Sequence, residues 1–434
     1  MKLAVIGGGT AGYIAAAHLT HRFPQAELLH VFDSSIPTIG VGEGTTPRFP
    51  IWFQEITGLD FDVLARRCRA TRKKGVLFDG WGPSGAPFLH RFQPIWLEGY
   101  HFDAGALLAV LGEHIRARHL DARVEAIESS AEGATIRFTD GSVERCDYVL
   151  DARGFLRRSA GMMPEDPVEL DWIPTGRALL RRLPPGLLVD VTRAAARPHG
   201  WIFQIPLRDW TSCGYVFNPR ISADAEIAED FTAFLCDESP GAWEERGALD
   251  FPNYMRGRLF DGRIFRVGNA AAFIEPLEAT AIGTAIVQVR AASDWIARGD
   301  PGDPVACEAL NALLRTYICR DSLFIALHYA NGSLWDTPFW RHAREGLARA
   351  RRSSFARPHV EAMQPYLAAG EALPGAALAR YEDKEAWDRD IVPKMGLFTP
   401  YGNFSALNFA QIGHGIGLYG AGQGETAAAA VSIG

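Results

Sequence analysis

Residues 3–12 read Leu-Ala-Val-Ile-Gly-Gly-Gly-Thr-Ala-Gly, a short apolar run that is followed at once by a glycine-rich turn. The apolar run predicts a buried strand, and residues 13–19 predict a helix after the turn. Gly7, Gly9 and Gly12 have the G-x-G-x-x-G spacing. Such glycines permit a tight turn, the approach of a diphosphate to backbone N–H groups, and close packing of helix on strand. This stretch predicts the first unit of a dinucleotide-binding α/β fold.

A second predicted strand, Glu27 to Phe32, ends at Asp33, which lies 33 − 12 = 21 residues beyond Gly12. A carboxylate at this place accepts a hydrogen bond from a ribose hydroxyl, which favours FAD or NAD over NADP. Thr10 and Ala11 lie in the turn and are expected at the cofactor, and the start of the helix that follows carries a partial positive charge that suits a diphosphate. We therefore expect a bound dinucleotide with an unphosphorylated ribose.

The composition of the 434 residues excludes several classes of protein. With 47% hydrophobic and 22% charged residues, the chain is expected to fold into two or three packed units and is neither disordered nor fibrous. The net charge of −7 gives no electrostatic signal for nucleic acid. An apolar stretch of 18 residues is absent from the sequence, so we expect neither a membrane span nor a membrane partner.

Six cysteines are scattered without C-x-x-C spacing, which argues against a zinc ribbon or a disulfide framework and predicts a reducing, cytoplasmic location and no metal site. Lysine is rare: five of the 44 basic residues are lysines, and two of these, Lys73 and Lys74, are adjacent. Because arginine serves nearly everywhere else, each lysine is slightly more informative, although a short cationic surface step is the commoner explanation of an adjacent pair.

Three units are predicted along the chain. Residues 134–138, the turn at 140–141 and residues 148–150 predict a hairpin that returns to the parallel sheet. Short β-rich segments predict an antiparallel sheet, a substrate platform inserted at about residues 165–255 of a cofactor domain that spans residues 1–300. Residues 301–434 are expected to form a mostly helical region on the substrate side. The expected fold class is thus an α/β, Rossmann-like FAD-binding flavoprotein monooxygenase fold with these two additions.

A second cofactor signature favours flavin over nicotinamide. Residues 266–271 read Arg-Val-Gly-Asn-Ala-Ala between a predicted strand and a predicted helix. Two-domain flavoproteins have a Gly-Asp pair at this place, which closes over the ribityl chain and the pyrophosphate. Here Gly268 is followed by Asn269, which keeps the hydrogen-bonding capacity and loses the charge. We expect FAD.

Three further motifs carry a resemblance to a known family. Residues 40–47 read Gly-Val-Gly-Glu-Gly-Thr-Thr-Pro, residues 201–206 read Trp-Ile-Phe-Gln-Ile-Pro, and residues 276–280 read Pro-Leu-Glu-Ala-Thr. Together they resemble the flavin-dependent tryptophan halogenases, over roughly residues 1–345. The resemblance adds three residues to the expected FAD site, which are Gly42, Glu43 and Ile282.

The resemblance implies an FADH2-dependent halogenase. A separate flavin reductase would supply FADH2, oxygen would give a flavin hydroperoxide, and chloride or bromide as co-substrate would be oxidised to hypohalous acid. This acid would travel to a lysine beside an indole or another electron-rich aromatic substrate. The matching lysine is Lys73, whose amine can hydrogen-bond hypohalous acid or be N-halogenated. The alternative is a surface cation, which is the role expected for Lys74.

Glu278 matches the glutamate that the family places opposite that lysine, where it would orient the halogenating species and accept the proton of the ring. A helix-start glutamate is the alternative. The amides of Thr280 and Ala281 match the family's halide site. The family segment Glu-Ser-Thr-Gly is replaced by Glu-Ala-Thr-Ala, so alanine stands where glycine would permit positive φ or close halide approach. Halide affinity and the choice of halide are left open.

Four residues are expected at the substrate. His90 and Phe92 match the family's H-x-F pair that stacks on the substrate ring, with a core pair as the alternative. Trp201 matches the first tryptophan of a W-x-W-x-I-P motif, and Phe203 replaces the second. The resemblance implies that this motif keeps the organic substrate away from the flavin, and Phe203 would preserve its bulk. Other aromatics are expected in the core more often than in the pocket: Trp335, Phe339, Trp340, Phe398, Tyr401 and Phe404.

Two rival functions remain open from the sequence. One is a flavin-dependent aromatic hydroxylase, a monooxygenase that would have no use for a remote lysine. The other is a non-catalytic protein that binds reduced flavin, and its support is the altered halide segment. The sequence decides neither the identity of the aromatic substrate nor the oligomeric state, for which a homodimer is kept open.

Overall fold

A computed structural model describes residues 1–36, 43–93, 96–154, 167–186, 189–238, 243–299, 302–373 and 401–419. The predicted site residue Gly42 and the aromatic Phe398 lie outside these ranges. Within them, no helix is long and apolar enough to cross a membrane.

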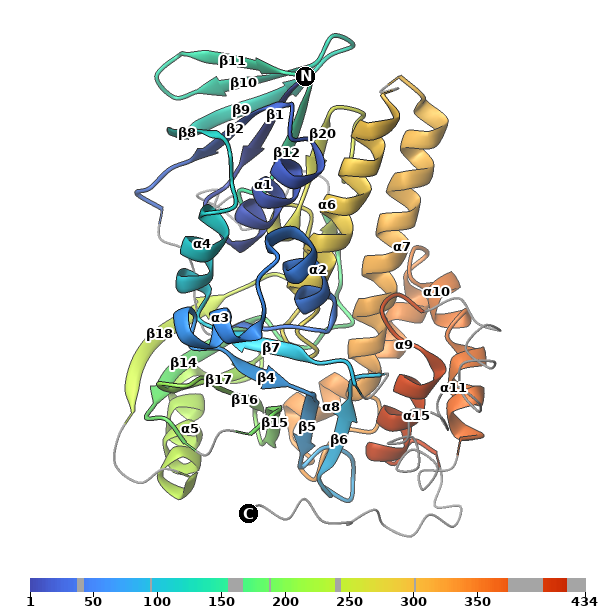
Figure 1. The fold of residues 1–434 in the computed structure, drawn as a ribbon. Helices are drawn as coiled ribbons and strands as arrows, with labels where there is room; N and C mark the ends of the chain where they lie inside the picture. The colour runs from blue at the N-terminus through green and yellow to red at the C-terminus, as the bar shows by residue number, and fades with distance from the viewer. Residues whose placement is uncertain are drawn as a thin grey trace.

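The first unit is a five-stranded parallel sheet with the strand order β20-β12-β1-β2-β8. Its strands are β1 (Lys2–Ile6), β2 (Glu27–Phe32), β8 (Arg118–Asp121), β12 (Tyr148–Asp151) and β20 (Ile264–Arg266). The glycine turn joins β1 to helix α1 (Thr10–Arg22), as the opening sequence predicts. Helix α6 (Thr280–Arg298) packs against α1 on the same side of the sheet (Figure 1).

Alternate side chains of β1 point to opposite faces of this sheet. Leu3 and Val5 are buried with α1 and α6, whereas Ala4 and Ile6 are buried against a separate antiparallel sheet. That sheet contains β9 (Val124–Ser129), β10 (Ala134–Phe138) and β11 (Val143–Cys146). The return of residues 148–150 to the parallel sheet is confirmed, because β12 pairs with β1. The hairpin itself differs from the prediction, since β10 pairs with β11, which the sequence pattern did not predict.

The second unit is a seven-stranded sheet with the order β18-β14-β17-β16-β15-β5-β6. Five strands lie inside the predicted insertion: β14 (Arg177–Leu183), β15 (Thr192–Arg197), β16 (Gly200–Pro206), β17 (Thr211–Phe217) and β18 (Glu244–Asp250). The sheet also contains β5 (Gly75–Asp79) and β6 (Phe88–Arg91), and β5 pairs in parallel with β15. The sequence pattern did not predict this pairing, because it joins segments that are far apart in the chain.

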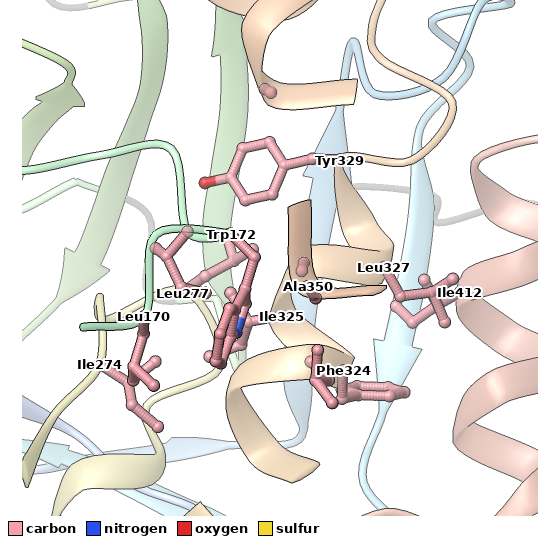
Figure 2. Packing of buried hydrophobic residues seen from close by; sticks show 14 of the residues in the cluster. Leu170, Trp172, Ile274, Leu277, Phe324, Ile325, Leu327, Tyr329, Ala350 and Ile412 are labelled. Atoms are coloured by element: carbon pink, nitrogen blue, oxygen red, sulfur yellow. The ribbon is translucent and has the colours of Figure 1, made fainter. Parts of the chain in front are cut away.

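Helix α5 (Asp224–Glu238) covers one face of the seven-stranded sheet, where Ile202 is buried. Trp201 and Phe203 point to the other face and join the largest core cluster. Helix α7 (Pro304–His328) supplies much of that cluster, and Figure 2 shows Phe324, Ile325 and Leu327 of α7 together with other members of the cluster.

Two small sheets and several short elements complete the described fold. The sheets are β3 (Glu43–Gly44) with β7 (Gly99–Phe102) and β4 (Thr71–Lys73), and β13 (Pro167–Glu169) with β19 (Tyr254–Arg256) and β21 (Ala272–Phe273). The remaining helices are α2 (Arg48–Thr57), α3 (Phe61–Arg67), α4 (Ala104–Gly112), the 3-10 turn η1 (Gly268–Ala270), α8 (Pro338–Arg344), α9 (Gly346–Arg352), α10 (Arg357–Glu361), α11 (Gln364–Glu371) and α15 (Ala406–Gly415).

Candidate active site

A cavity of about 1360 Å³ extends from the glycine turn to the face of the seven-stranded sheet. The three glycines of the motif have different surroundings. A Cβ on Gly7 would lie 2.3 Å from the carbonyl oxygen of Ala152, and one on Gly12 would lie 2.0 Å from that of Gly7. A Cβ on Gly9 would meet nothing within 4 Å. Gly7 and Gly12 therefore permit packing, and Gly9 leaves space in the cavity.

The predicted ribose acid and its neighbours line the same cavity. Asp33 follows β2, and its Oδ1 accepts hydrogen bonds from the backbone N–H and the hydroxyl of Ser35. Thr10, the first residue of α1, donates to a carboxylate oxygen of Glu43 over 3.3 Å. Burial raises the pKa of Glu43 to about 7, and the Thr10 bond opposes that shift.

The second cofactor signature packs directly against the first at the edge of the cavity. Gly268 has a φ of 58°, and a Cβ there would lie 2.6 Å from the Cβ of Ala11. Asn269 and Ile282 line the cavity beside it. Arg153, Arg256 and Arg266 also line the cavity, and no sequence motif predicts them. Acidic residues line it as well, and Arg153 pairs with Asp151 over 2.8 Å. Guanidinium groups are donors that match the oxygens of a diphosphate.

Lys73 is the last residue of β4, and it is fully buried, which excludes the surface-cation interpretation. Its side chain reaches the cavity, and its Nζ has no hydrogen-bond partner among the described residues. Nζ lies 5.4 Å from the ring centroid of Phe92, and a Cβ on Gly44 would lie 3.3 Å from Nζ. Burial lowers the pKa of Lys73 to about 8, while the charge of Glu278 opposes that shift. By contrast, the half-exposed Lys74 pairs with Asp190 over 2.8 Å.

Glu278 lies directly before α6 and is almost completely buried. Its Oε1 is 2.8 Å from Nδ1 of His90 and 2.7 Å from Nε2 of His328. Burial alone would raise the pKa of Glu278, but the two histidines hold that pKa below its ordinary value. The surroundings of Glu278 therefore favour its ionised form.

The imidazole ring of His90 is held by hydrogen bonds on both sides. It lies on β6, is buried, and has both ring nitrogens engaged, because Nδ1 meets Glu278 and Nε2 meets the side-chain amide of Asn408 at 2.9 Å. Phe92 is also buried, beside Lys73. Stacking of these two rings on a substrate stays a prediction, while the contact of His90 with Glu278 is an additional observation.

Trp201 and Phe203 lie on β16 and both line the cavity. Trp201 packs 6.4 Å from Trp81, between ring centroids, and Phe203 fits because Gly214 opposite it lacks a side chain. The other predicted aromatics belong to the core: Phe339, Trp340, Tyr401 and Phe404 are buried in it, and Trp335 packs against it.

The start of α6 differs from the expectation for the altered halide segment. Ala281 lies in the first turn of the helix and does not have positive φ, so the loss of glycine there causes no backbone strain. The strain lies at Ala279, whose φ is 53°. The left-handed conformation costs a residue with a side chain about 1–2 kcal/mol. The N–H groups of Thr280 and Ala281 are among those without a partner inside the helix.

Two residues of this site belong to no sequence motif. His328 ends α7, after an apolar run that gives no local sign of chemistry, and Asn408 lies in α15 near the end of the chain. Both become visible through their contacts with Glu278 and His90.

The comparisons with known proteins agree with this architecture. The family model of tryptophan halogenases matches residues 2–99 and 97–356, which is more than half of the chain. The chain therefore belongs to the tryptophan halogenase family, and its fold is the α/β fold of flavin-dependent halogenases.

Individual relatives are distant. The tryptophan 7-halogenase RebH of Lentzea aerocolonigenes is 24% identical over 79% of each chain. The crystal structure of the tryptophan 6-halogenase SttH of Streptomyces toxytricini has a TM-score of 0.78 and 20% identity, and covers 96% of this chain and 91% of that one. BrvH, a flavin-dependent halogenase from Brevundimonas sp. BAL3, has a TM-score of 0.72 and 22% identity, and covers 96% and 90%.

Proposed function

We propose that this protein is an FADH2-dependent halogenase that chlorinates or brominates an indole or another electron-rich aromatic compound. One observation carries the proposal: a buried, unpartnered lysine amine meets the cofactor cavity beside Trp201 and Phe203, with an ionised glutamate close enough to affect its pKa. A direct hydroxylase has no use for such a lysine.

The residues around the cavity fit FAD. The open space at Gly9, the contact of Gly268 with Ala11, and the three arginines suit its diphosphate, and Asp33 suits its ribose. When bound and reduced, FAD would supply, with oxygen, the equivalents that oxidise chloride or bromide to hypohalous acid. A separate flavin reductase would provide the reduced cofactor. The amides of Thr280 and Ala281 would hold the halide.

Lys73 and Glu278 would then act on the substrate ring. The ammonium of Lys73 can donate a hydrogen bond to hypohalous acid and polarise it toward the ring, since no protein acceptor among the described residues competes for its protons. As the halogen bonds to carbon, the ring becomes cationic, and Glu278 accepts the proton that restores aromaticity. Trp201 and Phe203 would keep the ring apart from the flavin while the small oxidant passes.

The test combines the purified protein with FAD, a flavin reductase, NADH and either chloride or bromide, and screens a panel of indoles by mass spectrometry. Replacement of hydrogen by halogen is expected in at least one substrate. A gain of oxygen without halogen would instead indicate the hydroxylase, and flavin binding without turnover would indicate a reduced-flavin carrier. Free tryptophan and indoles without an amino-acid group belong in the same panel, because the sequence does not decide the identity of the aromatic substrate.

A further inference from the structure

The hydrogen bonds around Glu278 allow the protons to be counted. Asn408 accepts from the backbone N–H of Ser405 through Oδ1, at 2.8 Å, so its amide nitrogen is the atom that faces His90. An amide nitrogen only donates, so Nε2 of His90 accepts and is unprotonated. Nδ1 of His90 therefore carries the hydrogen and donates it to Oε1 of Glu278. His90 is neutral in this network.

The same count gives a different result for His328. Its Nδ1 is 2.8 Å from the carbonyl oxygen of Phe324, which only accepts, so Nδ1 carries a hydrogen. Its Nε2 is 2.7 Å from Oε1 of Glu278, and this contact requires one further proton between the two atoms. The proton belongs either to an imidazolium on His328 or to a neutral carboxylic acid on Glu278.

The position of the oxygen decides between these two states. Both histidines contact the same atom, Oε1. If Oε1 were protonated, it would donate to His328 and accept from His90 as a neutral hydroxyl oxygen. If Oε1 is ionised, it accepts from both histidines, and hydrogen bonds to an ionised acceptor are the stronger ones. The ionised state is therefore favoured. The N-terminus of α6, which begins two residues after Glu278, also favours the negative charge.

We infer that His328 is a positioning residue that carries a second imidazole proton, and that this imidazolium holds Glu278 ionised by binding its Oε1. No hydrogen bond engages Oε2 within the described ranges, so it is the oxygen that can take the proton from the halogenated ring. In that step the ring C–H bond breaks, its electron pair restores aromaticity, and the proton forms a bond to Oε2. The inference rests on the proposed function for this last step alone.

A metal ion is the competing interpretation of the cluster. Ligand atoms of His90, Glu278 and His328 lie within 4.8 Å of one another, and two histidines with one carboxylate are a known ligand set. However, a metal on Nδ1 of His90 would require a hydrogen on Nε2, where the amide of Asn408 already donates. The donor count thus favours the proton over a metal.

A pH experiment on Glu278 has to account for the other ionisable groups that face it. In the described part of the chain, the ionisable groups facing it are Lys73 from β4, His90 from β6 and His328 from α7, while α15 contributes the uncharged Asn408. Loss of the imidazolium leaves burial to act on the carboxylate, which raises its pKa. Because the ring proton is taken by the ionised form, the acidic limb of the rate profile should move to higher pH.

The experiment compares His328→Gln with His414→Gln in the FAD-loaded full chain. Glutamine can donate a neutral hydrogen bond to Oε1 but cannot carry the charge. For His328→Gln we expect kcat to fall about 10- to 100-fold. The acidic limb of its pH–rate profile should move to higher pH, while KM and FAD affinity stay nearly unchanged. His414 bonds the carbonyl of Leu373, away from Glu278, and its variant should keep the wild-type profile. A reduced kcat with an unshifted limb would mean a merely structural role and would overturn the inference.

A second readout does not depend on activity. Nitrogen-15 NMR of the 12 histidines, assigned by difference with His328→Gln, should show both ring nitrogens of His328 protonated at neutral pH and His90 protonated on Nδ1 alone. A neutral His328 would overturn the inference even if halogenation is found. A doubly protonated His328 in a protein that halogenates nothing would sink the proposed function instead. Stoichiometric metal by elemental analysis, with loss of activity in chelator, would also contradict the proton assignment.

Discussion

The glycine cradle at residues 7–12 and the centre around Lys73 and Glu278 are built in opposite ways. The cradle is local: one strand, one turn and one helix place its glycines within six residues of sequence. The centre takes its residues from β4, β6, the start of α6, the end of α7 and α15. A local site tolerates changes elsewhere in the fold, whereas an assembled site depends on the packing of the whole domain. This difference shows where substitutions should affect chemistry and where they should affect folding.

The largest effect is expected from Lys73→Ala in the assembled centre. Loss of the amine that polarises the oxidant should reduce halogenation by at least about 100-fold, while FAD affinity stays close to the wild-type value. Product mass and flavin titration measure the two quantities. Lys74→Ala is the matched control, since Lys74 pairs with Asp190 at the surface. Retained product formation in Lys73→Ala would refute the assigned role.

In the local cradle, Gly12→Ala should destabilise the fold and Gly9→Ala should not. The Cβ at position 12 would lie 2.0 Å from a backbone oxygen, and forcing extra atoms into packed structure costs about 1–3 kcal/mol. The Cβ at position 9 would meet open space, so that variant should weaken FAD binding alone. Thermal melting with and without FAD compares them, and equal melting temperatures would disprove the division of roles.

A third test uses pH on the assembled centre. The pKa of Lys73 is lowered to about 8 by burial, so the ammonium dominates below that pH. If the ammonium is the active form, the rate should fall about tenfold per pH unit above this value. A rate that rises through pH 8 would indicate the neutral amine. Chloride and bromide should give the same alkaline limb, because a limb set by the hypohalous acid would differ between the halides.

The smallest effect is expected from Ala279→Gly, between the two regions. Glycine adopts positive φ freely, so this change should relieve strain and stabilise the fold by about 1 kcal/mol. Denaturant unfolding measures it. Ala281→Gly, in the first turn of α6, is the control and should not stabilise. Stabilisation of Ala281→Gly instead would mean that the strain lies where the sequence comparison first placed it.

The local parts of the fold were predictable because their signals are local. The strand at residues 27–32, the glycine turn and the strands β10 and β12 lie where the sequence pattern predicts them. The parallel pairing of β5 with β15 was not predictable, since no short-range pattern specifies which distant strands meet. For the same reason, the contacts of His328 and Asn408 with the site could not be predicted from the sequence.

By itself, the sequence determined the dinucleotide-binding start of the chain, the resemblance to flavin-dependent halogenases and the identity of Lys73 and Glu278 as candidates. Backbone conformation and motif spacing act over a few residues, which is why the dinucleotide-binding start could be predicted from local pattern, while Lys73 and Glu278 became candidates through the resemblance. Tertiary structure decided that Lys73 is buried without a partner and that Glu278 is held by two histidines. Burial and charge depend on neighbours brought together by folding, so the electrostatic state of both groups exists only in the packed chain.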